Sequence, residues 1–280
     1  MKDLLKNIIP NWLKALVRKT VEYVLNSVFY SQNEASHKNF IVTFHKCGSQ
    51  WFRTVFVSKK MHDASSYRFF TYRLLPFKGY DDRPLNERPI NRISESSGIF
   101  GPLYTDRSGL DNVLEENDKV VVIIRDPRTV IPSWYDSVLK THAKMGNVGE
   151  LRSKIANSEL AAGMDVMIDH AVSFGTFIAM ESWMTAAETD SRIRIIRFED
   201  IFSTDQEQEF VSLLNHFGLT FNMEKVRKVL DSNSFARMTK KNKHYKKGKN
   251  RSWTNKLTDL QVKRIVESCP KTMKLYELER

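Results

Sequence analysis

The sequence predicts an α/β fold in which helices cover both faces of a central, mostly parallel sheet. Three short apolar runs, 40–44, 119–124 and 193–198, are long enough to form buried strands. Segments with helical periodicity separate these runs, and that alternation is typical of parallel sheets covered on both faces. Ligands of such sheets bind beyond the carboxyl ends of the strands, so functional residues are expected just after each run.

The composition indicates a globular protein with an anionic partner. Hydrophobic residues make up 41% of the 280 residues and aromatic residues 11%, which excludes a disordered chain. Lys and Arg number 44 against 33 Asp and Glu, and the formal net charge of +11 favours a nucleotide, glycan, nucleic acid or acidic membrane as partner. Cys47 and Cys269 have no metal-binding spacing, so neither a disulfide framework nor a metal site is expected. No apolar stretch approaches the roughly 20 residues of a membrane span, and we expect a cytoplasmic protein.

Residues 1–30 are predicted to form a basic amphipathic helix, separate from a domain that spans residues 31–280. Apolar residues recur at helical spacing from Leu13 to Val28, with Lys14 and Arg18 between them. Two interpretations stay open. The apolar side packs on the domain, or the helix lies on an anionic bilayer and makes a peripheral membrane contact.

The strand predicted at 40–44 ends in a loop that suits a phosphate. The loop contains Lys46 and Gly48, and a helix is expected over 51–57. A strand, a short glycine-containing loop and a helix N-terminus together present backbone N–H groups to an anion. Because Lys46 comes before the glycine, the spacing is not that of the Walker A loop.

The strand predicted at 119–124 is followed by a second set of anion-binding groups. Arg125 comes directly after the strand, and a helix that begins at Pro127 carries Ser133 about two turns in. We expect Arg125 and Ser133 to hold one anion from two directions. The other expected elements are a strand at 98–104 and helices at 164–187, 206–217 and 223–230.

The stretch from Arg237 to Arg251 is strongly basic, with eight Lys or Arg in fifteen positions and one glycine, Gly248. A loop that closes over a phosphate-bearing ligand accounts for both features. A solvated loop is the alternative. No nucleic-acid-binding motif surrounds the stretch, so a nucleic-acid partner is not expected.

These segments resemble, in the same order, the motifs of the sulfotransferases that use 3′-phosphoadenosine 5′-phosphosulfate (PAPS). Residues 44–51, FHKCGSQW, are similar to the YPKSGTTW loop, and Arg125-Asp126-Pro127 with Ser133 is similar to the R-x-P…S element. The family's YED, SFxxM and RKGxxGDWKNxFT motifs have counterparts at 198–200, 233–238 and 246–258. The resemblance implies the P-loop-like sulfotransferase fold, transfer of sulfonate from PAPS to a hydroxyl or amine, and no metal.

The resemblance also implies which residues bind PAPS. Lys46 meets the 5′-phosphate oxygen that becomes negative as the S–O bond breaks, and Arg125 grips the 3′-phosphate. Trp51 either stacks on the adenine opposite Phe235 or belongs to the core. The implied PAPS-binding residues are Lys46, Cys47, Gly48, Ser49, Gln50, Trp51, Arg125, Ser133, Phe198, Phe235, Lys246, Lys247 and Gly248.

The acceptor side departs from the family pattern. Pro102 stands where the family has the histidine that takes the acceptor's proton, and Asp106 and His142 are the candidate general bases, each otherwise an ordinary surface residue. Mixed charges over 67–107 favour a polar small molecule or a glycan as acceptor. The family's dimer motif is broken at Thr254, Asp259 and Lys263, so the oligomeric state stays open.

Two other functions remain as alternatives. A nucleotide-dependent kinase would have a Lys-Ser/Thr pair after the loop glycine, which this loop lacks. A non-catalytic protein that binds anionic lipid or glycan would account for residues 1–30 and the net charge, but not for the nucleotide motifs.

Overall fold

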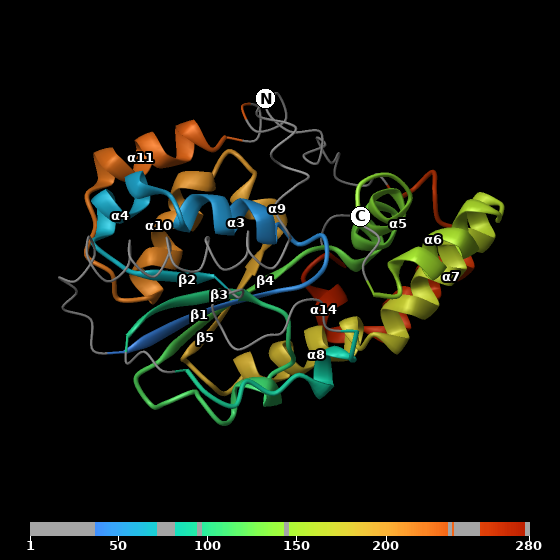
Figure 1. Cartoon of the computed structure of the whole chain (residues 1–280), viewed down its shortest axis with the longest axis horizontal. Coiled ribbons are helices and arrows are strands. Elements are labelled where there is room, and N and C mark those ends of the chain that lie inside the picture. The colour runs from blue at the N-terminus through green and yellow to red at the C-terminus, as the bar shows by residue number, and fades with distance from the viewer. Residues whose placement is uncertain are drawn as a thin grey trace, which may run out of the picture.

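The computed structural model describes residues 37–71, 82–93, 97–142, 146–234, 237 and 253–277. Within these residues five parallel strands form one sheet, in the order β2-β3-β1-β4-β5 (Figure 1). The strands are β1 (Lys38–Thr43), β2 (Phe69–Thr71), β3 (Gly98–Leu103), β4 (Lys119–Ile124) and β5 (Ile193–Arg197). The predicted α/β class with a parallel sheet is confirmed.

Alternate residues of the central strands enter two separate cores. On β1, Phe40 and Val42 are fully buried in one core, and Ile41 is fully buried in the other. Val122 and Val121 divide in the same way on β4. Both faces of the sheet are therefore covered, which explains why the strands appear in the sequence as unbroken apolar runs.

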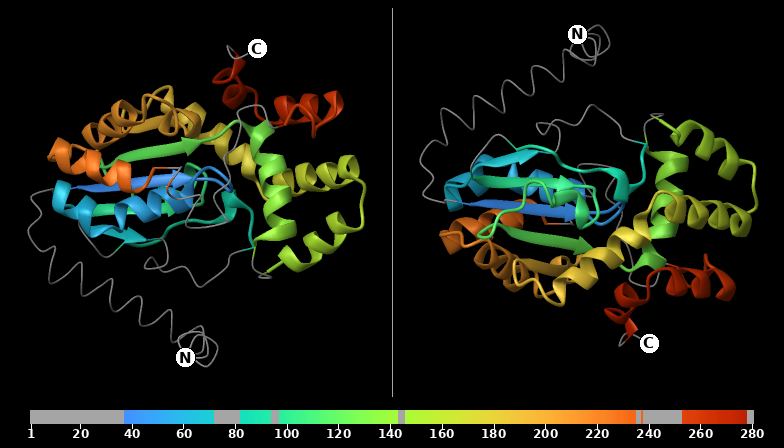
Figure 2. Two further views of the ribbon diagram at one scale, coloured as in Figure 1. Left: turned by 90° about the horizontal axis from the view of Figure 1, so that it is seen from above. Right: turned by 90° about the horizontal axis from the view of Figure 1, so that it is seen from below.

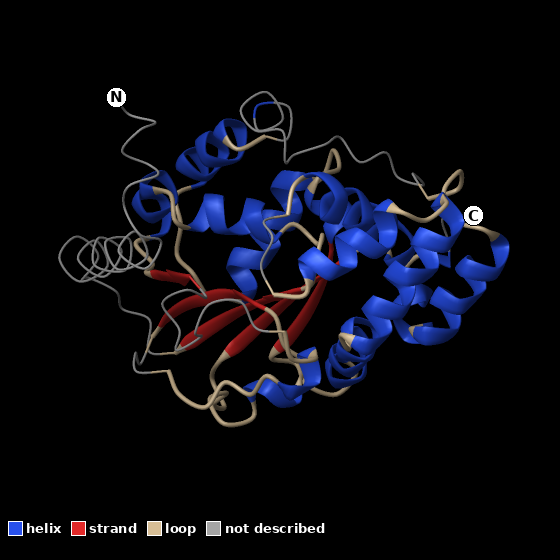
Figure 3. Cartoon of the chain, turned by 45° about the vertical axis from the view of Figure 1, so that its right-hand side comes forward, coloured by secondary structure: helices blue, strands red, loops and turns tan. Residues whose placement is uncertain are grey.

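Helices contribute to the core on each side of the sheet, and Figure 3 shows several of them lying over one face. The core that contains Ile41 is covered by α3 (Ser49–Phe56), α4 (Lys59–Ser65), α9 (Phe198–Ile201), α10 (Gln206–His216) and α11 (Met223–Ser232). The core that contains Phe40 also includes residues of α5 (Pro127–Lys140), α6 (Val148–Ala156), α7 (Leu160–Ser173), α8 (Thr176–Ala187), α13 (Asp259–Ser268) and α14 (Pro270–Lys274). Two short 3₁₀ turns, η2 (Leu85–Glu87) and η3 (Ser108–Leu110), lie in the loops around β3.

The long helix expected over 164–187 is two helices, α7 and α8, separated at Gly175. This glycine has a left-handed backbone with φ of 71°, and a Cβ there would lie 2.8 Å from Oδ1 of Asn86. The break lets the carbonyl oxygen of Phe174 accept a hydrogen bond of 2.9 Å from the N–H of Leu85. A helical pattern continues across the break in the sequence, so periodicity alone predicts one helix.

The strand order brings two of the predicted anion-binding segments together. β1 lies between β3 and β4. After β1 the chain forms β2 and β3 on one edge side of β1, and it then crosses to form β4 and β5 on the opposite edge side. Ligands of open α/β sheets bind at such a reversal. The helices α5, α6 and α7 lie beyond the carboxyl ends of the strands (Figure 2). No helix in the described part of the chain is long and apolar enough to span a bilayer.

Candidate nucleotide and acceptor site

The loop between β1 and α3 forms a cradle for an anion. Lys46 and Gly48 both have left-handed backbones, with φ of 66° and 86°, and the chain therefore turns sharply from the strand into the helix. The N–H of Trp51 donates to the carbonyl oxygen of Gly48 at 2.8 Å and starts the helix. Gly48 has no side chain to cap α3, so the first N–H groups, on Ser49 and Gln50, suit a phosphate.

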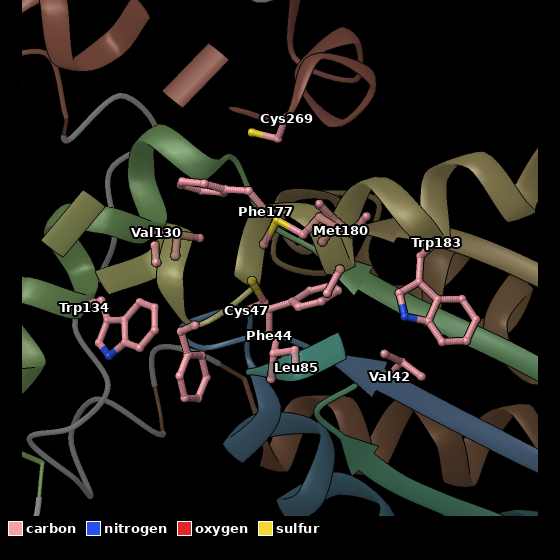
Figure 4. Close-up of a cluster of buried hydrophobic side chains, with 14 of the residues drawn as sticks. Val42, Phe44, Cys47, Leu85, Val130, Trp134, Phe177, Met180, Trp183 and Cys269 are labelled. Carbon is pink, nitrogen blue, oxygen red and sulfur yellow. The ribbon is translucent and has the colours of Figure 1, made fainter. Parts of the chain in front are cut away.

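Cys47 orders this loop from within. Its side chain is fully buried and lies beside Phe44 (Figure 4). Its N–H donates to the carbonyl oxygen of Phe44 at 3.1 Å, and its own carbonyl oxygen accepts a hydrogen bond of 3.3 Å from the hydroxyl of Thr43. Burial raises the pKa of the Cys47 thiol to about 12, so the thiol stays protonated. Cys47 is therefore a buried thiol whose backbone N–H and carbonyl group hold the shape of the loop.

Arg125 stands at the end of β4 and links three elements. Its Nη1 donates to the carbonyl oxygen of Lys46 at 3.0 Å and to Oγ of Ser133 on α5 at 3.5 Å. Its guanidinium lies 4.6 Å from the ring centroid of Phe198, and its Nε is 3.9 Å from the carboxylate of Glu199. Nε is buried and has no hydrogen-bond partner. The guanidinium is thus held at the end of the sheet, between the loop after β1, the helix α5 and the Phe198-Glu199 pair.

The Phe198-Glu199 pair supports both the loop and the arginine. A Cβ on Gly48 would lie 2.8 Å from the Phe198 ring, so only glycine allows this contact. The Glu199 carboxylate accepts hydrogen bonds from the N–H of Asp126 at 3.4 Å and from the hydroxyl of Tyr276 at 3.3 Å. Burial raises the pKa of Glu199, although the charge of Arg125 opposes the shift.

Trp51 lies in the core that covers the α3 face of the sheet. It is 1% exposed, and its indole N–H donates to the carbonyl oxygen of Asn233 at 2.9 Å. The rings that contact it edge to face are those of Phe52, Phe202 and Phe210. Of the two interpretations of Trp51, this position corresponds to the core residue. Four other predicted PAPS-binding residues lie outside the described residues, namely Phe235, Lys246, Lys247 and Gly248.

The two predicted general bases lie in different surroundings. The carboxylate of Asp106 accepts hydrogen bonds from the hydroxyl of Ser108 at 2.9 Å and from the N–H of Gly109 at 3.0 Å, so it is engaged in the η3 turn. His142 lies just beyond the last residue of α5 and close enough to His45 for its charge to act on that ring. Of the two candidates, the structure therefore brings His142 into the neighbourhood of the loop.

His45 is a site residue that the sequence analysis did not single out. Its ring stacks on Trp134 with the centroids 4.5 Å apart and the planes at 7°. Tyr104, beyond β3, and Phe174, beyond α7, are 5.1 and 5.3 Å from it. Burial lowers the pKa of His45 well below its ordinary value, and the charge of His142 adds to the effect. The signal in the sequence is that His45 replaces the proline of the YPKSGTTW motif.

A parallel α/β sheet with a glycine-containing loop suited to an anion after its first strand, and an arginine after a neighbouring strand, is the arrangement typical of nucleotide-binding α/β proteins. The model of the sulfotransferase domain matches residues 36–277, and the chain therefore belongs to the sulfotransferase domain family. This match confirms the predicted family and the predicted enzyme class, a PAPS-dependent sulfotransferase.

Solved structures with the same fold are similar to the chain over most of its length. A mouse sulfotransferase complexed with PAP aligns with 91% of this chain and 90% of its own chain, with a TM-score of 0.56 and 16% identity. The structure of retinol dehydratase in complex with androsterone and PAP aligns with 90% of this chain and 85% of its own chain, with a TM-score of 0.50 and 13% identity. The structure of retinol dehydratase in a complex with retinol and PAP aligns with 90% of this chain and 86% of its own chain, with a TM-score of 0.51 and 12% identity. A comparison of the sequence with curated proteins gives no match.

Proposed function

We propose that this sulfotransferase binds PAPS across the carboxyl ends of β1 and β4 and transfers its sulfonate to a hydroxyl or amine of a polar small molecule or glycan. The observation that carries the proposal is the hydrogen bond between Arg125 and the carbonyl oxygen of Lys46, 3.0 Å long. It joins the two segments that suit anions, so one ligand with two phosphate groups can engage both.

The loop after β1 takes the 5′-phosphosulfate. The N–H groups of Gly48, Ser49 and Gln50 face the phosphate, and the dipole of α3 adds a favourable field. Lys46 supplies the cation for the oxygen that becomes negative when the S–O bond breaks. Cys47 shapes the loop, and Phe198 supports it through the contact at Gly48.

The 3′-phosphate binds between β4 and α5. Nη1 of Arg125 and Oγ of Ser133 are 3.5 Å apart there, and the guanidinium and the hydroxyl can both donate hydrogen bonds to a phosphate. From the resemblance, we assign Lys246, Lys247 and Gly248 to the same phosphate and Phe235 to the adenine. Trp51 contributes by holding the segment at Asn233.

The neighbourhood of His45 favours a polar acceptor. Trp134 and Phe174 are buried, and the side chains in front of them that remain part-exposed are His45, Tyr104 and His170. Buried aromatic rings thus lie against side chains that are partly exposed and carry polar atoms. This arrangement suits a glycan or a nitrogen-rich molecule better than a steroid-like one.

Isothermal titration calorimetry with PAP, which is adenosine 3′,5′-bisphosphate, and with adenosine 5′-phosphate tests the donor site. PAP is expected to bind more tightly because only PAP carries the 3′-phosphate. Equal affinity for the two nucleotides would contradict the proposal and favour the kinase alternative. For the acceptor, the enzyme and PAPS are incubated with phenols, amines, sterols and oligosaccharides, and sulfonated products are detected by their mass. A strong preference for sterols or apolar phenols would contradict the polar acceptor.

Residues 1–30 lie outside the described residues, and we propose from the sequence that they are separable from a domain of residues 31–280 in a cytoplasmic enzyme. Every donor motif lies after Phe40, so deletion of residues 1–30 is expected to leave PAP binding unchanged. Loss of sedimentation with vesicles of anionic lipid in the deletion variant would support a peripheral membrane contact. A lower melting temperature instead would support packing on the domain, and loss of PAP binding by a folded variant would contradict both.

A further inference from the structure

His45 and Lys46, neighbours in the loop, serve two different sides of the site. The carbonyl oxygen of Lys46 accepts a hydrogen bond from Arg125 on the β4 side, where the 3′-phosphate is proposed to bind. The ring of His45 lies on the β3 side, against Tyr104 and Trp134. The loop therefore brings an imidazole to the region left for the acceptor, directly beside the lysine assigned to the departing phosphate oxygen.

The ring of His45 has a fixed position. It is stacked on Trp134. Trp134 is 3% exposed and belongs to the cluster of buried hydrophobic side chains in Figure 4. The ring of Phe174 meets the ring of His45 at an angle of 79° with the centroids 5.3 Å apart. A side chain held on two sides in this way can present its nitrogen atoms to a substrate in one orientation.

One nitrogen of His45 has an unfilled hydrogen-bonding capacity. The Nδ1 atom is buried and has no hydrogen-bond partner. Buried polar atoms in proteins are hydrogen-bonded in the great majority of cases, so such an atom near a ligand-binding loop indicates a partner supplied by the ligand. An acceptor hydroxyl or amine is a donor that fits this position.

Burial keeps the ring of His45 neutral, and the charges around the ring act in the same direction. The groups that face it are Lys46 from its own loop, Arg88 from the loop after η2, His142 from the end of α5 and His170 from α7. Burial is the largest cause of the lowered pKa, and these positive or protonatable groups act in the same direction. A neutral imidazole keeps a lone pair at neutral pH and can therefore accept a proton.

We propose that His45 is the general base that removes the proton from the acceptor; this inference rests on the proposed sulfonate transfer. As the acceptor oxygen or nitrogen bonds to sulfur, the bond from sulfur to the 5′-phosphate oxygen breaks, and its electron pair stays on that oxygen beside Lys46. The acceptor's proton passes to Nδ1 of His45 and then to solvent. Asp106 is engaged in the η3 turn, and His142 acts on His45 as a neighbouring charge.

The test uses phenol and 4-nitrophenol as probe acceptors with PAPS. The two share a ring, but 4-nitrophenol loses its proton far more readily and needs little help from a base. In His45→Gln, sulfonation of phenol is expected to slow by about 100-fold to 10,000-fold, and sulfonation of 4-nitrophenol by much less. Added imidazole is expected to restore part of the phenol activity of His45→Gly. His62→Gln, on α4, is the matched control.

The outcomes separate this inference from the proposed function. Equal slowing with both phenols would indicate that His45 only supports the pocket and would overturn the inference. Selective slowing in His142→Gln but not in His45→Gln would overturn it in favour of His142. PAP binding is measured for each variant by calorimetry and is expected to match the wild type. If the wild type itself does not bind PAP, the proposed donor site is wrong, whatever the histidine variants do.

Discussion

The Nη1 atom of Arg125 donates a hydrogen bond of 3.0 Å to the carbonyl oxygen of Lys46. These residues lie 79 positions apart in the sequence, at the ends of the neighbouring strands β4 and β1. The bond fixes the backbone of the loop proposed to bind the 5′-phosphosulfate to the arginine proposed to bind the 3′-phosphate. The two residues are nevertheless expected to have different roles. Lys46 stabilises a negative charge that develops on the 5′-phosphate oxygen during the reaction, whereas Arg125 binds a 3′-phosphate that is charged before the reaction begins.

Lys46→Ala is expected to abolish most of the turnover and leave PAP binding within a few-fold of the wild type. The lysine acts mainly on the oxygen that becomes negative in the transition state, and loss of one such preorganised group raises the barrier by about 3 to 4 kcal/mol, or about 100-fold to 1,000-fold in kcat. Rates with PAPS and affinities for PAP are compared with those of Lys59→Ala, which removes an exposed lysine of α4. Normal turnover in Lys46→Ala would exclude this role.

Arg125→Ala is expected to weaken PAP binding and to remove the preference for PAP over adenosine 5′-phosphate. Hydrogen bonds to a charged group contribute about 1.5 to 3 kcal/mol each, which corresponds to about 10-fold to 100-fold in affinity. The measurement is calorimetric titration of both nucleotides, with Arg227→Ala as the control because Arg227 pairs with Glu207 on the surface. If the variant still discriminates between the nucleotides, another residue binds the 3′-phosphate.

The features of the fold and the site that could be predicted are those formed by residues close together in the sequence. The strands β1 and β4 are buried on both faces, so each appears as an apolar run, and the phosphate loop directly follows β1. The three-residue strand β2 is too short to give such a signal. Periodicity places Trp51 on an apolar helix face but does not say whether that face meets a ligand or the core.

The cluster of rings around His45 could not be predicted because four separate segments build it. His45 comes from the loop after β1, Tyr104 from beyond β3, Trp134 from α5 and Phe174 from the break between α7 and α8. The break itself depends on Gly175, which periodicity does not reveal. Local patterns therefore locate the donor-binding segments, whereas the acceptor region depends on tertiary contacts.

The free energy of unfolding is expected to fall as the pH is lowered below about 6.5. Burial lowers the pKa values of His45, His170 and His216 in the folded protein, so the unfolded chain binds more protons in this range and acid favours it. Above the unfolded pKa the stability from the neutral rings is fully present, and it is lost toward the lower, folded pKa values. The slope for His45 is at most about 1.4 kcal/mol per pH unit.

Urea unfolding of the wild type and of His45→Gln at pH 7.5 and 5.5 measures this contribution. The difference between the two proteins isolates His45, because Glu199 and the other titratable groups are common to both. The acid-induced loss of stability is expected to be smaller in His45→Gln. An identical loss in both proteins would mean that His45 can protonate in the folded state without penalty.

Tyr276→Phe is expected to destabilise the protein through Glu199. The hydroxyl of Tyr276 lies 3.3 Å from both the Glu199 carboxylate and the carbonyl oxygen of Ile124, and the side chain is 1% exposed. Its removal leaves buried acceptors with fewer donors, which costs about 1 to 3 kcal/mol. Because Glu199 is also 3.9 Å from Arg125, the carboxylate is expected to draw closer to the guanidinium and compete with the 3′-phosphate.

Urea unfolding and PAP titration of Tyr276→Phe check both effects. The control is Tyr135→Phe, at a buried tyrosine of α5 that packs against Gly163. Lower stability together with a several-fold weaker affinity for PAP is expected for Tyr276→Phe alone. If stability falls but PAP affinity is unchanged, the tyrosine supports only the packing of the C-terminal segment, and Glu199 does not transmit the change to Arg125. If the control loses as much of both, the effect belongs to the removal of any buried hydroxyl.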